Sequence, residues 1–339
     1  MNRDLYVIVL AAGKGQRMAS RNENYSKVAY PILGKPLVNY VLDAAKPLNA
    51  KETFVVVGFG GEETIKCVQN EAKVVWQKEV LGTGHAVMQV SEYLKDKEGD
   101  VLILCGDTPL LTTETLEKIY KKYQKNTNHL IICSTVLSNP EGYGRVIREK
   151  PSYRVLEVRP YAEISEEEKE IGEINSGIYL VDNKTLQVYL PKLSRQNKKD
   201  EYYLSDIVGL MFKDGLSVDS YVLEDAEDIY NINDRVQLAF ASKTLRKRIN
   251  HRLMYSGVSI EDPETAYISS DAIIGKDTII RPNVHILGKC NVGPANWIGP
   301  DVTLTNVNMG ENNHISYSTV ENLDLGNGEV IGPFEVRKQ

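Results

Sequence analysis

Short apolar runs alternate with helical patterns from residue 5 to about residue 230. The runs are rich in Val, Ile and Leu and have the length of buried strands; they cover residues 6–10, 54–57, 74–76, 101–105 and 130–136. Between them, apolar residues recur at helical spacing over 37–45 and 87–94. The first helix should open at Pro36, because proline is favoured at the first helical position. This alternation predicts an α/β fold with a mainly parallel sheet covered by helices.

Beyond residue 260 the apolar positions recur every six residues instead. Seven consecutive positions carry an aliphatic side chain: Ile268, Ile274, Ile280, Ile286, Val292, Ile298 and Leu304. A hexad repeat predicts a parallel β-helix, in which each six-residue face points one aliphatic side chain inward. A β-sandwich, the alternative, would alternate every two residues. The register slips after Leu304, then resumes in part at Met309 and Ile315 and again at Leu325 and Ile331.

A long basic amphipathic stretch joins the two patterns. Apolar residues such as Phe240 and Leu245 recur there at helical spacing among lysines and arginines, as in a helix with one apolar face. We therefore predict three parts: an α/β domain over residues 1–233, a connecting helix over 234–255 and a short β-helix over 256–339.

Composition and charge exclude several classes of protein. The net charge of -6 and the pI near 5.6 argue against a general nucleic-acid binder, which needs a broad basic face. No apolar run approaches the roughly 20 residues that span a bilayer. The apolar start over residues 5–12 lacks the cleavage site of a signal peptide, so we interpret it as a first strand. The four cysteines form no Cys-x-x-Cys pair, which favours a reducing compartment, the cytoplasm.

The Gly-rich segment over residues 10–18 follows the first predicted strand directly. Backbone N–H groups at Gly13 and Gly15 can approach phosphates there, and Lys14 and Arg17 supply counter-charge. The segment is therefore a candidate triphosphate-binding loop, with a plain structural turn as the alternative. It is no Walker A motif, because Ser or Thr does not follow Lys14. Met18 in place of a third glycine argues against a Rossmann fingerprint.

Asp107 follows the apolar run 101–105, at the carboxyl edge where α/β sheets bind ligands. A carboxylate in this place suits Mg²⁺, which prefers oxygen ligands and takes only one or two from protein. The alternative is a turn-forming Asp before Pro109. Thr112 and Thr113 are available to cap the next helix, so Asp107 is not needed for that.

A larger set of motifs extends these features over essentially the whole chain. They lie at residues 10–18, 27–28, 34–37, 77, 81–86, 106–110, 142–145, 173–177, 201–206, 257–258 and 262–263. Together they resemble the sugar-phosphate nucleotidyltransferases and specifically the N-acetylglucosamine-1-phosphate uridyltransferases. The resemblance implies a Rossmann-like domain followed by a left-handed β-helix. It also implies Mg²⁺-dependent uridylyl transfer from UTP to N-acetylglucosamine-1-phosphate, giving UDP-N-acetylglucosamine and pyrophosphate for cell-wall and amino-sugar biosynthesis.

The resemblance also implies a role for each matching residue around the nucleotide. Arg17 and Lys27 would hold the β- and γ-phosphates, with Asp107 completing the catalytic set and Asp107 and Asn233 as metal ligands. The residues around the nucleotide would be Leu10, Ala11, Ala12, Gly13, Lys27, Gln77, Gly82 and Thr83, with Gln77 pairing to the uracil imide edge. The alternatives are a solvated surface cation for Arg17 and Lys27, and a helix cap for Asn233 and Thr83.

The residues implied for the sugar are Gly144, Glu157, Asn175, Tyr203 and Ser205. For Glu157 the register of its segment leaves Val158 or Arg159 as alternatives. Ser205 could equally be only the cap of the helix that follows it.

Full-length relatives in this family also carry an acetyltransferase site in a longer β-helix, between the subunits of a trimer. Its matching residues lie beyond Gln339, so we expect no acetyltransferase activity, whether that end is natural or engineered. We expect a homotrimer through the β-helix, with a monomer as the alternative. His285 and His314 fall in no matching motif.

Three other functions compete with this interpretation. The same fold could act on another sugar-1-phosphate, since a fold does not fix its substrate. It could also be a non-catalytic regulatory subunit, although Arg17, Lys27, Asp107 and Asn233 are all retained. An NAD-dependent oxidoreductase would need the ribose-binding acid that is missing after the run 54–57.

Overall fold

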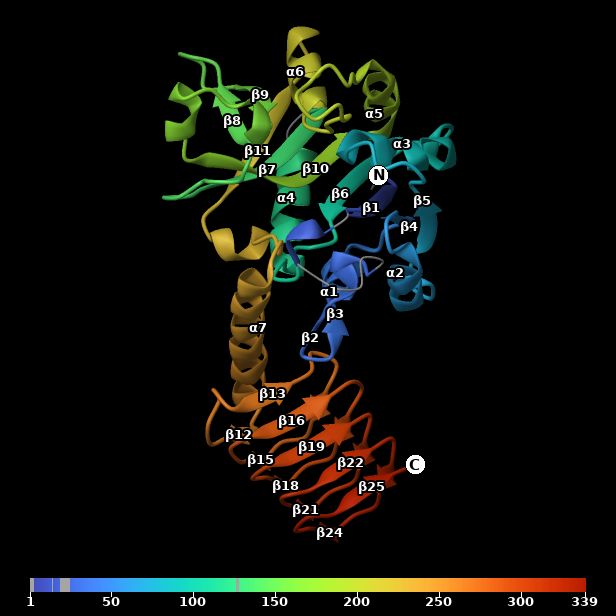
Figure 1. Cartoon of the computed structure of the whole chain (residues 1–339), viewed down its shortest axis with the longest axis vertical. Helices are drawn as coiled ribbons and strands as arrows, with labels where there is room; N and C mark the ends of the chain where they lie inside the picture. Colours follow the sequence, from blue (N-terminus) through green and yellow to red (C-terminus); the bar gives the residue numbers. More distant parts are fainter. Residues whose placement is uncertain (1–2, 14, 19–24, 126–127) are drawn as a thin grey trace. The chain divides into compact units, whose positions relative to one another are not determined.

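The computed structural model describes residues 3–13, 15–18, 25–125 and 128–339, which group into two compact units (Figure 1). The first unit comprises residues 1–30 and 37–234, and the second comprises residues 31–36 and 235–339.

The first unit is built on a nine-stranded sheet with a parallel centre. Its order is β11 (Val218–Leu223), β7 (Leu130–Val136), β10 (Glu173–Asp182), β6 (Asp100–Cys105), β1 (Leu5–Ala11), β4 (Glu52–Val57) and β5 (Lys73–Trp76). β10 is antiparallel to both of its neighbours, and the other pairs along this path are parallel. β8 (Arg145–Arg148) and β9 (Val155–Arg159) form a hairpin, which joins the sheet through the antiparallel pairing of β8 with β10. The prediction of a mainly parallel sheet is confirmed, but the strands after β7, namely β8, β9, β10 and β11, were not predicted.

Helices cover both faces of this sheet, because its strands direct alternate apolar side chains to each face. In β1, Tyr6 and Ile8 point into one core while Val7 and Val9 point into the other. The first core is closed by α3 (Thr83–Leu94), α5 (Asn183–Tyr189) and α6 (Asp206–Lys213). The second is closed by α1 (Leu37–Ala45), α2 (Gly61–Val68) and α4 (Thr113–Lys125). The α/β prediction is therefore confirmed.

The start of α1 corrects one expectation. The helix begins at Leu37, and Pro36 lies instead in β3 (Lys35–Pro36), which pairs with β2 (Pro31–Ile32) in a hairpin. Leu33 and Gly34 have φ values of 50° and 81°, so a tight turn forms before Pro36 and carries the extended backbone through it. Proline fits there because its fixed φ also suits an edge strand.

The second unit continues from α7 (Arg235–Tyr255) into three stacked parallel sheets that form a β-helix. One sheet holds β12 (Ser259–Ile260), β15 (Ile279–Ile280), β18 (Trp297–Ile298), β21 (His314–Ile315) and β24 (Val330–Ile331). The next holds β13 (Ala266–Ile268), β16 (Val284–Leu287), β19 (Val302–Thr305), β22 (Thr319–Glu321) and β25 (Val336–Lys338). The third holds β14 (Ile273–Ile274), β17 (Asn291–Val292), β20 (Asn308–Met309) and β23 (Asp324–Leu325).

Shortened coils explain the register slip in the sequence. Ile280, Ile298, Ile315 and Ile331 are paired in succession, at separations of 18, 17 and 16 residues. The stack of inward-pointing isoleucines is thus kept, while the turns between the strands become shorter. The prediction of a β-helix is confirmed. Within the described ranges, no helix has the length and apolar character that a membrane span requires.

Candidate active site at the carboxyl edge of the sheet

The loops after β1 and β6 leave the sheet at the same edge. The two strands are parallel neighbours, but the chain continues from β1 to β4 on one side while β6 lies on the other. Open α/β sheets bind ligands at such a switch point. Gly106, just past β6, donates its N–H to the carbonyl of Leu10 at 2.9 Å. Ala11 and Ala12 are buried there, and Gly13 is exposed.

The ammonium group of Lys27 connects two of the predicted site residues. Lys27 opens the short 3₁₀ helix η2 (Lys27–Ala29), and its Nζ lies 2.5 Å from Oδ2 of Asp107 and 3.0 Å from Oδ1 of Asn233. The side chains of Lys27 and Asp107 are only 11% and 17% exposed, so their attraction is less screened than that of a surface pair. Lys27 is therefore not a solvated surface cation.

The segment before α7 supplies two further contacts to Asp107. Asn231 donates from Nδ2 to Oδ1 of Asp107 at 3.0 Å, and the N–H of Ile232 donates to the Asp107 carbonyl at 2.9 Å. Because α7 begins at Arg235, Asn233 lies one residue before the cap position and does not occupy it. Sequence analysis missed Asn231. Its spacing of two from Asn233, with the buried Ile232 between them, is the signal that could have found it.

The Gly-rich loop passes against Lys27. It enters a single 3₁₀ turn, η1 (Gln16–Met18), in which Met18 is buried. Gly15 has a φ of 59°, and a Cβ there would lie 2.7 Å from the Cβ of Lys27, so a glycine is required. Arg17 is exposed on this turn. Lys14, the other predicted counter-charge, lies outside the described residues.

Tyr143 links Arg17 to Asp107 electrostatically, although sequence analysis gave it no role. Burial raises the pKa of Tyr143, the neighbouring Tyr230 and Asp107 raise it further, and Arg17 acts in the opposite direction. The phenol therefore stays neutral at neutral pH. Arg17 and Asp107 therefore both interact electrostatically with the phenol of Tyr143.

Three of the residues predicted around the nucleotide, Gln77, Gly82 and Thr83, lie between the end of β5 and the start of α3. Gln77 is buried, and its Nε2 donates to the carbonyl of Gly82 at 3.0 Å and contacts Nδ1 of His85 at 3.0 Å. Its amide donor thus supports the turn at Gly82. Thr83 is exposed and accepts a hydrogen bond from the N–H of Leu204 at 3.0 Å. Since α3 begins at Thr83 itself, that hydroxyl does not cap the helix; it ties α3 to the motif at 201–206.

Two of the predicted sugar residues are joined through the backbone. The N–H of Asn175 donates to the carbonyl of Gly144 at 3.0 Å, and its Nδ2 donates to the hydroxyl of Tyr179 at 2.8 Å. In β9, Val158 is buried in the core, whereas Glu157 and Arg159 are partly exposed and form an ion pair. The side chain of Val158 is therefore not available to a ligand.

Polar groups at the start of α6 lie close to Glu157. Ser205 precedes the helix with helical φ and ψ of -56° and -25°, and its side chain makes no capping hydrogen bond with the described residues. The hydroxyl of Tyr203 is buried without a hydrogen-bond partner in the described part of the chain, and burial raises its pKa to about 12. The pKa of Asp206 is raised to about 6, mainly by burial and then by Glu157 and Glu163.

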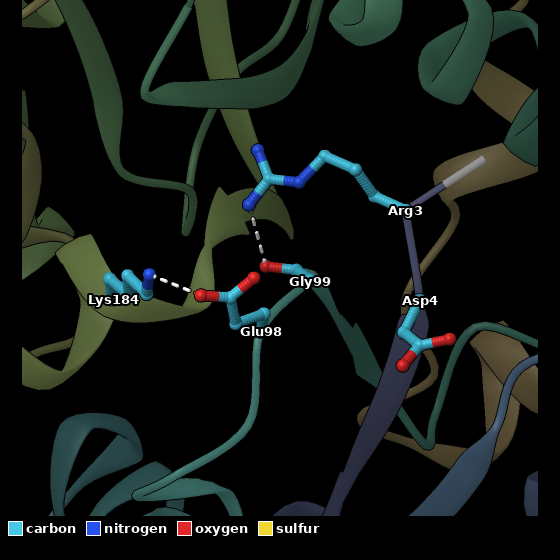
Figure 2. A pocket seen from close by; sticks show the side chains of 5 residues that line it. All are labelled: Arg3, Asp4, Glu98, Gly99 and Lys184. Atoms are coloured by element: carbon cyan, nitrogen blue, oxygen red, sulfur yellow. Dashed lines mark hydrogen bonds and ion pairs between the residues drawn. The ribbon is translucent and has the colours of Figure 1, made fainter. Parts of the chain in front are cut away.

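An open hollow lies at the opposite, amino edge of the sheet. It has a volume of about 340 Å³ and is lined by Arg3, Asp4, Glu98, Gly99 and Lys184 (Figure 2). Lys184 pairs with Glu98 at 2.5 Å, and Arg3 donates to the Gly99 carbonyl at 3.1 Å. Asp4 pairs with Lys51 and Arg3 with Asp182, so the charged groups of the hollow already have partners, and the predicted site residues do not line it.

Known proteins resemble this chain over nearly its full length. A model of the MobA-like NTP transferase domain matches residues 7–156. The bifunctional protein GlmU of Caldanaerobacter subterraneus subsp. tengcongensis is 41% identical over 331 residues, which cover 98% of this chain and 71% of that protein. The bifunctional protein GlmU of Clostridioides difficile is 38% identical over 327 residues, covering 96% and 70%. The chain therefore belongs to the GlmU family and is a sugar nucleotidyltransferase with a MobA-like NTP transferase domain.

Proposed function

We propose that the chain joins UTP to N-acetylglucosamine-1-phosphate, forming UDP-N-acetylglucosamine and pyrophosphate. An oxygen of the sugar phosphate forms a bond to the α-phosphorus of UTP, while the bond from that phosphorus to the bridging oxygen of the β-phosphate breaks. Two anions must approach each other, so the reaction needs positive charge and alignment more than a nucleophilic side chain.

The observation that carries this proposal is the position of the Lys27 ammonium between Asp107 and Asn233. A carboxylate oxygen and an amide oxygen converge there on one cation, and both are ligands that Mg²⁺ accepts. Asp107 and Asn233 would hold the ion. A site of this kind leaves most ligands to phosphate and water. When bound, Mg²⁺ neutralises phosphate charge.

The basic side chains do the remaining electrostatic work. Lys27 and Arg17 supply positive charge to the β- and γ-phosphates and to the departing pyrophosphate. The backbone of the loop from Leu10 to Gly13 would contact the nucleotide. Gln77, Gly82 and Thr83, between β5 and α3, would contact it as well. Gly144, Asn175, Glu157, Tyr203 and Ser205 would hold the acetamido sugar, whose hydroxyls need hydrogen-bond acceptors of this kind.

Pyrophosphate release from UTP and Mg²⁺ with three acceptors tests the proposal: the 1-phosphates of N-acetylglucosamine, N-acetylgalactosamine and glucose. We expect N-acetylglucosamine-1-phosphate to give the highest kcat/KM. Asp107→Asn and Asn233→Ala should each lower it by about 100-fold. Asp4→Asn is the matched control, because Asp4 pairs with Lys51 at the same 2.5 Å in an exposed position.

Each failure has a separate meaning. Preference for another sugar phosphate would replace the proposed substrate. Release with none of them would favour a non-catalytic subunit of the same fold. An unimpaired Asp107→Asn variant would overturn the metal assignment.

A further inference from the structure

Helix α6 carries a glycine, Gly209, in its interior, where glycine is less favourable than alanine. The reason lies in the neighbouring strand. A Cβ built at Gly209 would lie 3.3 Å from the Cβ of Glu157 and 3.8 Å from its Oε2. The missing side chain therefore lets β9 approach α6 closely at Glu157.

Glu157 is held from two sides at this place. Arg159 donates a short hydrogen bond from Nη2 to Oε1 of Glu157. On the other side lies the face of α6 that carries Gly209 and, one turn earlier, Asp206, which interacts electrostatically with Glu157. The side chain of Glu157 nevertheless remains 31% exposed. Its carboxylate is thus fixed in position and still accessible to a ligand.

The surroundings of Glu157 connect it to the other predicted sugar residues. A Cβ at Gly144 would lie 3.0 Å from the carbonyl oxygen of Arg159, so the end of β9 lies against that glycine. Gly144 in turn accepts a hydrogen bond from Asn175 at 3.0 Å. Asn175 contacts the hydroxyl of Tyr179, and the charge of Asp206 contributes to the raised pKa of that hydroxyl. A chain of backbone contacts through Arg159 and Gly144 therefore connects Glu157 to Asn175.

We propose that Gly209 is a positioning residue for the sugar-phosphate substrate: its lack of a side chain places the Glu157 carboxylate where it accepts hydrogen bonds from the sugar. The inference rests on the proposed function, since it takes a sugar phosphate as the acceptor. A methyl group at 209 would push Glu157 by a few tenths of an ångström, and hydrogen bonds weaken as their geometry departs from the optimum. The Lys27–Asp107 pair belongs to other elements, so UTP binding should be spared.

Gly209→Ala tests the proposal through the separate KM values of the two substrates. We expect the KM for N-acetylglucosamine-1-phosphate to rise about tenfold, and that for UTP to change by less than about twofold. The melting temperature should stay or rise, because alanine favours the helix. In a Glu157→Ala background, Gly209→Ala should add less than about twofold to the sugar-phosphate KM, because no carboxylate remains to be displaced. Lys213→Ala, exposed on the same helix, is the control and should change neither KM.

Two results would overturn the inference and leave the proposed function intact. One is an unchanged sugar-phosphate KM in a Gly209→Ala variant that circular dichroism shows to be folded. The other is an equal KM increase in the Glu157→Ala background. A wild type that is inert with every sugar phosphate would instead overturn the proposed function, and this inference with it.

Discussion

The ammonium of Lys27 lies 2.5 Å from Oδ2 of Asp107, although 80 residues separate the two in the chain. Both side chains are largely buried, so the removal of either leaves the charge of the other poorly solvated. The pair holds the segment after β1 to the segment after β6. The Lys27–Asp107 pair should therefore contribute both to the stability of the fold and to the proposed reaction.

Lys27→Met should show both contributions. We expect the free energy of unfolding to fall by about 1–3 kcal/mol, because Asp107 loses a charged hydrogen-bond partner, and kcat/KM to fall by about 100-fold. Urea denaturation and pyrophosphate release measure the two effects. Lys51→Met removes a pair of the same length with Asp4, but Lys51 is 56% exposed, so its loss should change the free energy of unfolding far less. Equal losses from the two variants would contradict the prediction.

Asn231 should tune the metal requirement without being a ligand. Its Nδ2 donates to Oδ1 of Asp107 at 3.0 Å, which orients the carboxylate, and losing such a partner typically costs 10–100-fold in metal affinity. We expect Asn231→Ala to raise the Mg²⁺ concentration for half-maximal activity by about tenfold. Asn139→Ala, in an exposed loop, should leave it unchanged. An unaltered Mg²⁺ dependence of Asn231→Ala would remove Asn231 from the site.

The predictable part of this site is the part that follows directly from strand ends. Asp107 comes just after an apolar run, and β6 ends at Cys105 as that run indicates, so the position of its carboxylate at the sheet edge could be predicted. The contact of Asn231 with Asp107 spans 124 residues and depends on the path of the segment before α7. Local periodicity carries no such information.

β10 and Gln77 show two other limits. The strand over Glu173–Asp182 has an irregularity between Asn175 and Tyr179, and Gly177 there has a φ of 81°. That break interrupts the alternation by which a strand is recognised. Gln77 matched a nucleotide-binding position, but its amide nitrogen contacts Gly82 and His85. A sequence motif identifies the residue type and leaves its partners open.

The pH dependence of stability should carry a contribution from Asp206. Its pKa is raised to about 6, first by burial and then by Glu157 and Glu163, against about 3.9 in an unfolded chain. Below both values the carboxyl is neutral in both states. As the pH rises from about 4 to about 6, the unfolded chain ionises more easily, so the folded state loses stability.

Asp206→Asn should flatten this part of the profile, because the amide does not ionise. Urea midpoints at several pH values, for wild type and variant, measure the difference. Asp214→Asn is a control of opposite sign, since Lys192 and Tyr189 lower the pKa of Asp214 and its contribution is lost as the pH falls. Parallel profiles for wild type and Asp206→Asn would show that Asp206 titrates normally.

Gly82 should be sensitive to the addition of a single methyl group. Its φ is 103°, and a Cβ there would lie 2.5 Å from the carbonyl oxygen of Tyr202. That carbonyl accepts the N–H of Gly84 at 2.8 Å, while the N–H of Tyr202 donates to Leu81 at 2.7 Å. Gly82→Ala must therefore separate α3 from the 201–206 segment. We expect a loss of more than about 2 kcal/mol in the free energy of unfolding and a raised KM for UTP.

Gly215→Ala separates the two causes of that loss. Gly215 also has a positive φ, 75°, but a Cβ there would meet no described atom within 4 Å. It should therefore cost only the backbone strain of about 1 kcal/mol and leave the KM for UTP unchanged. Urea denaturation and UTP titration of both variants measure the difference. If the two variants lose the same stability, backbone strain alone explains the requirement for glycine, and the contact with Tyr202 does not hold α3 in place.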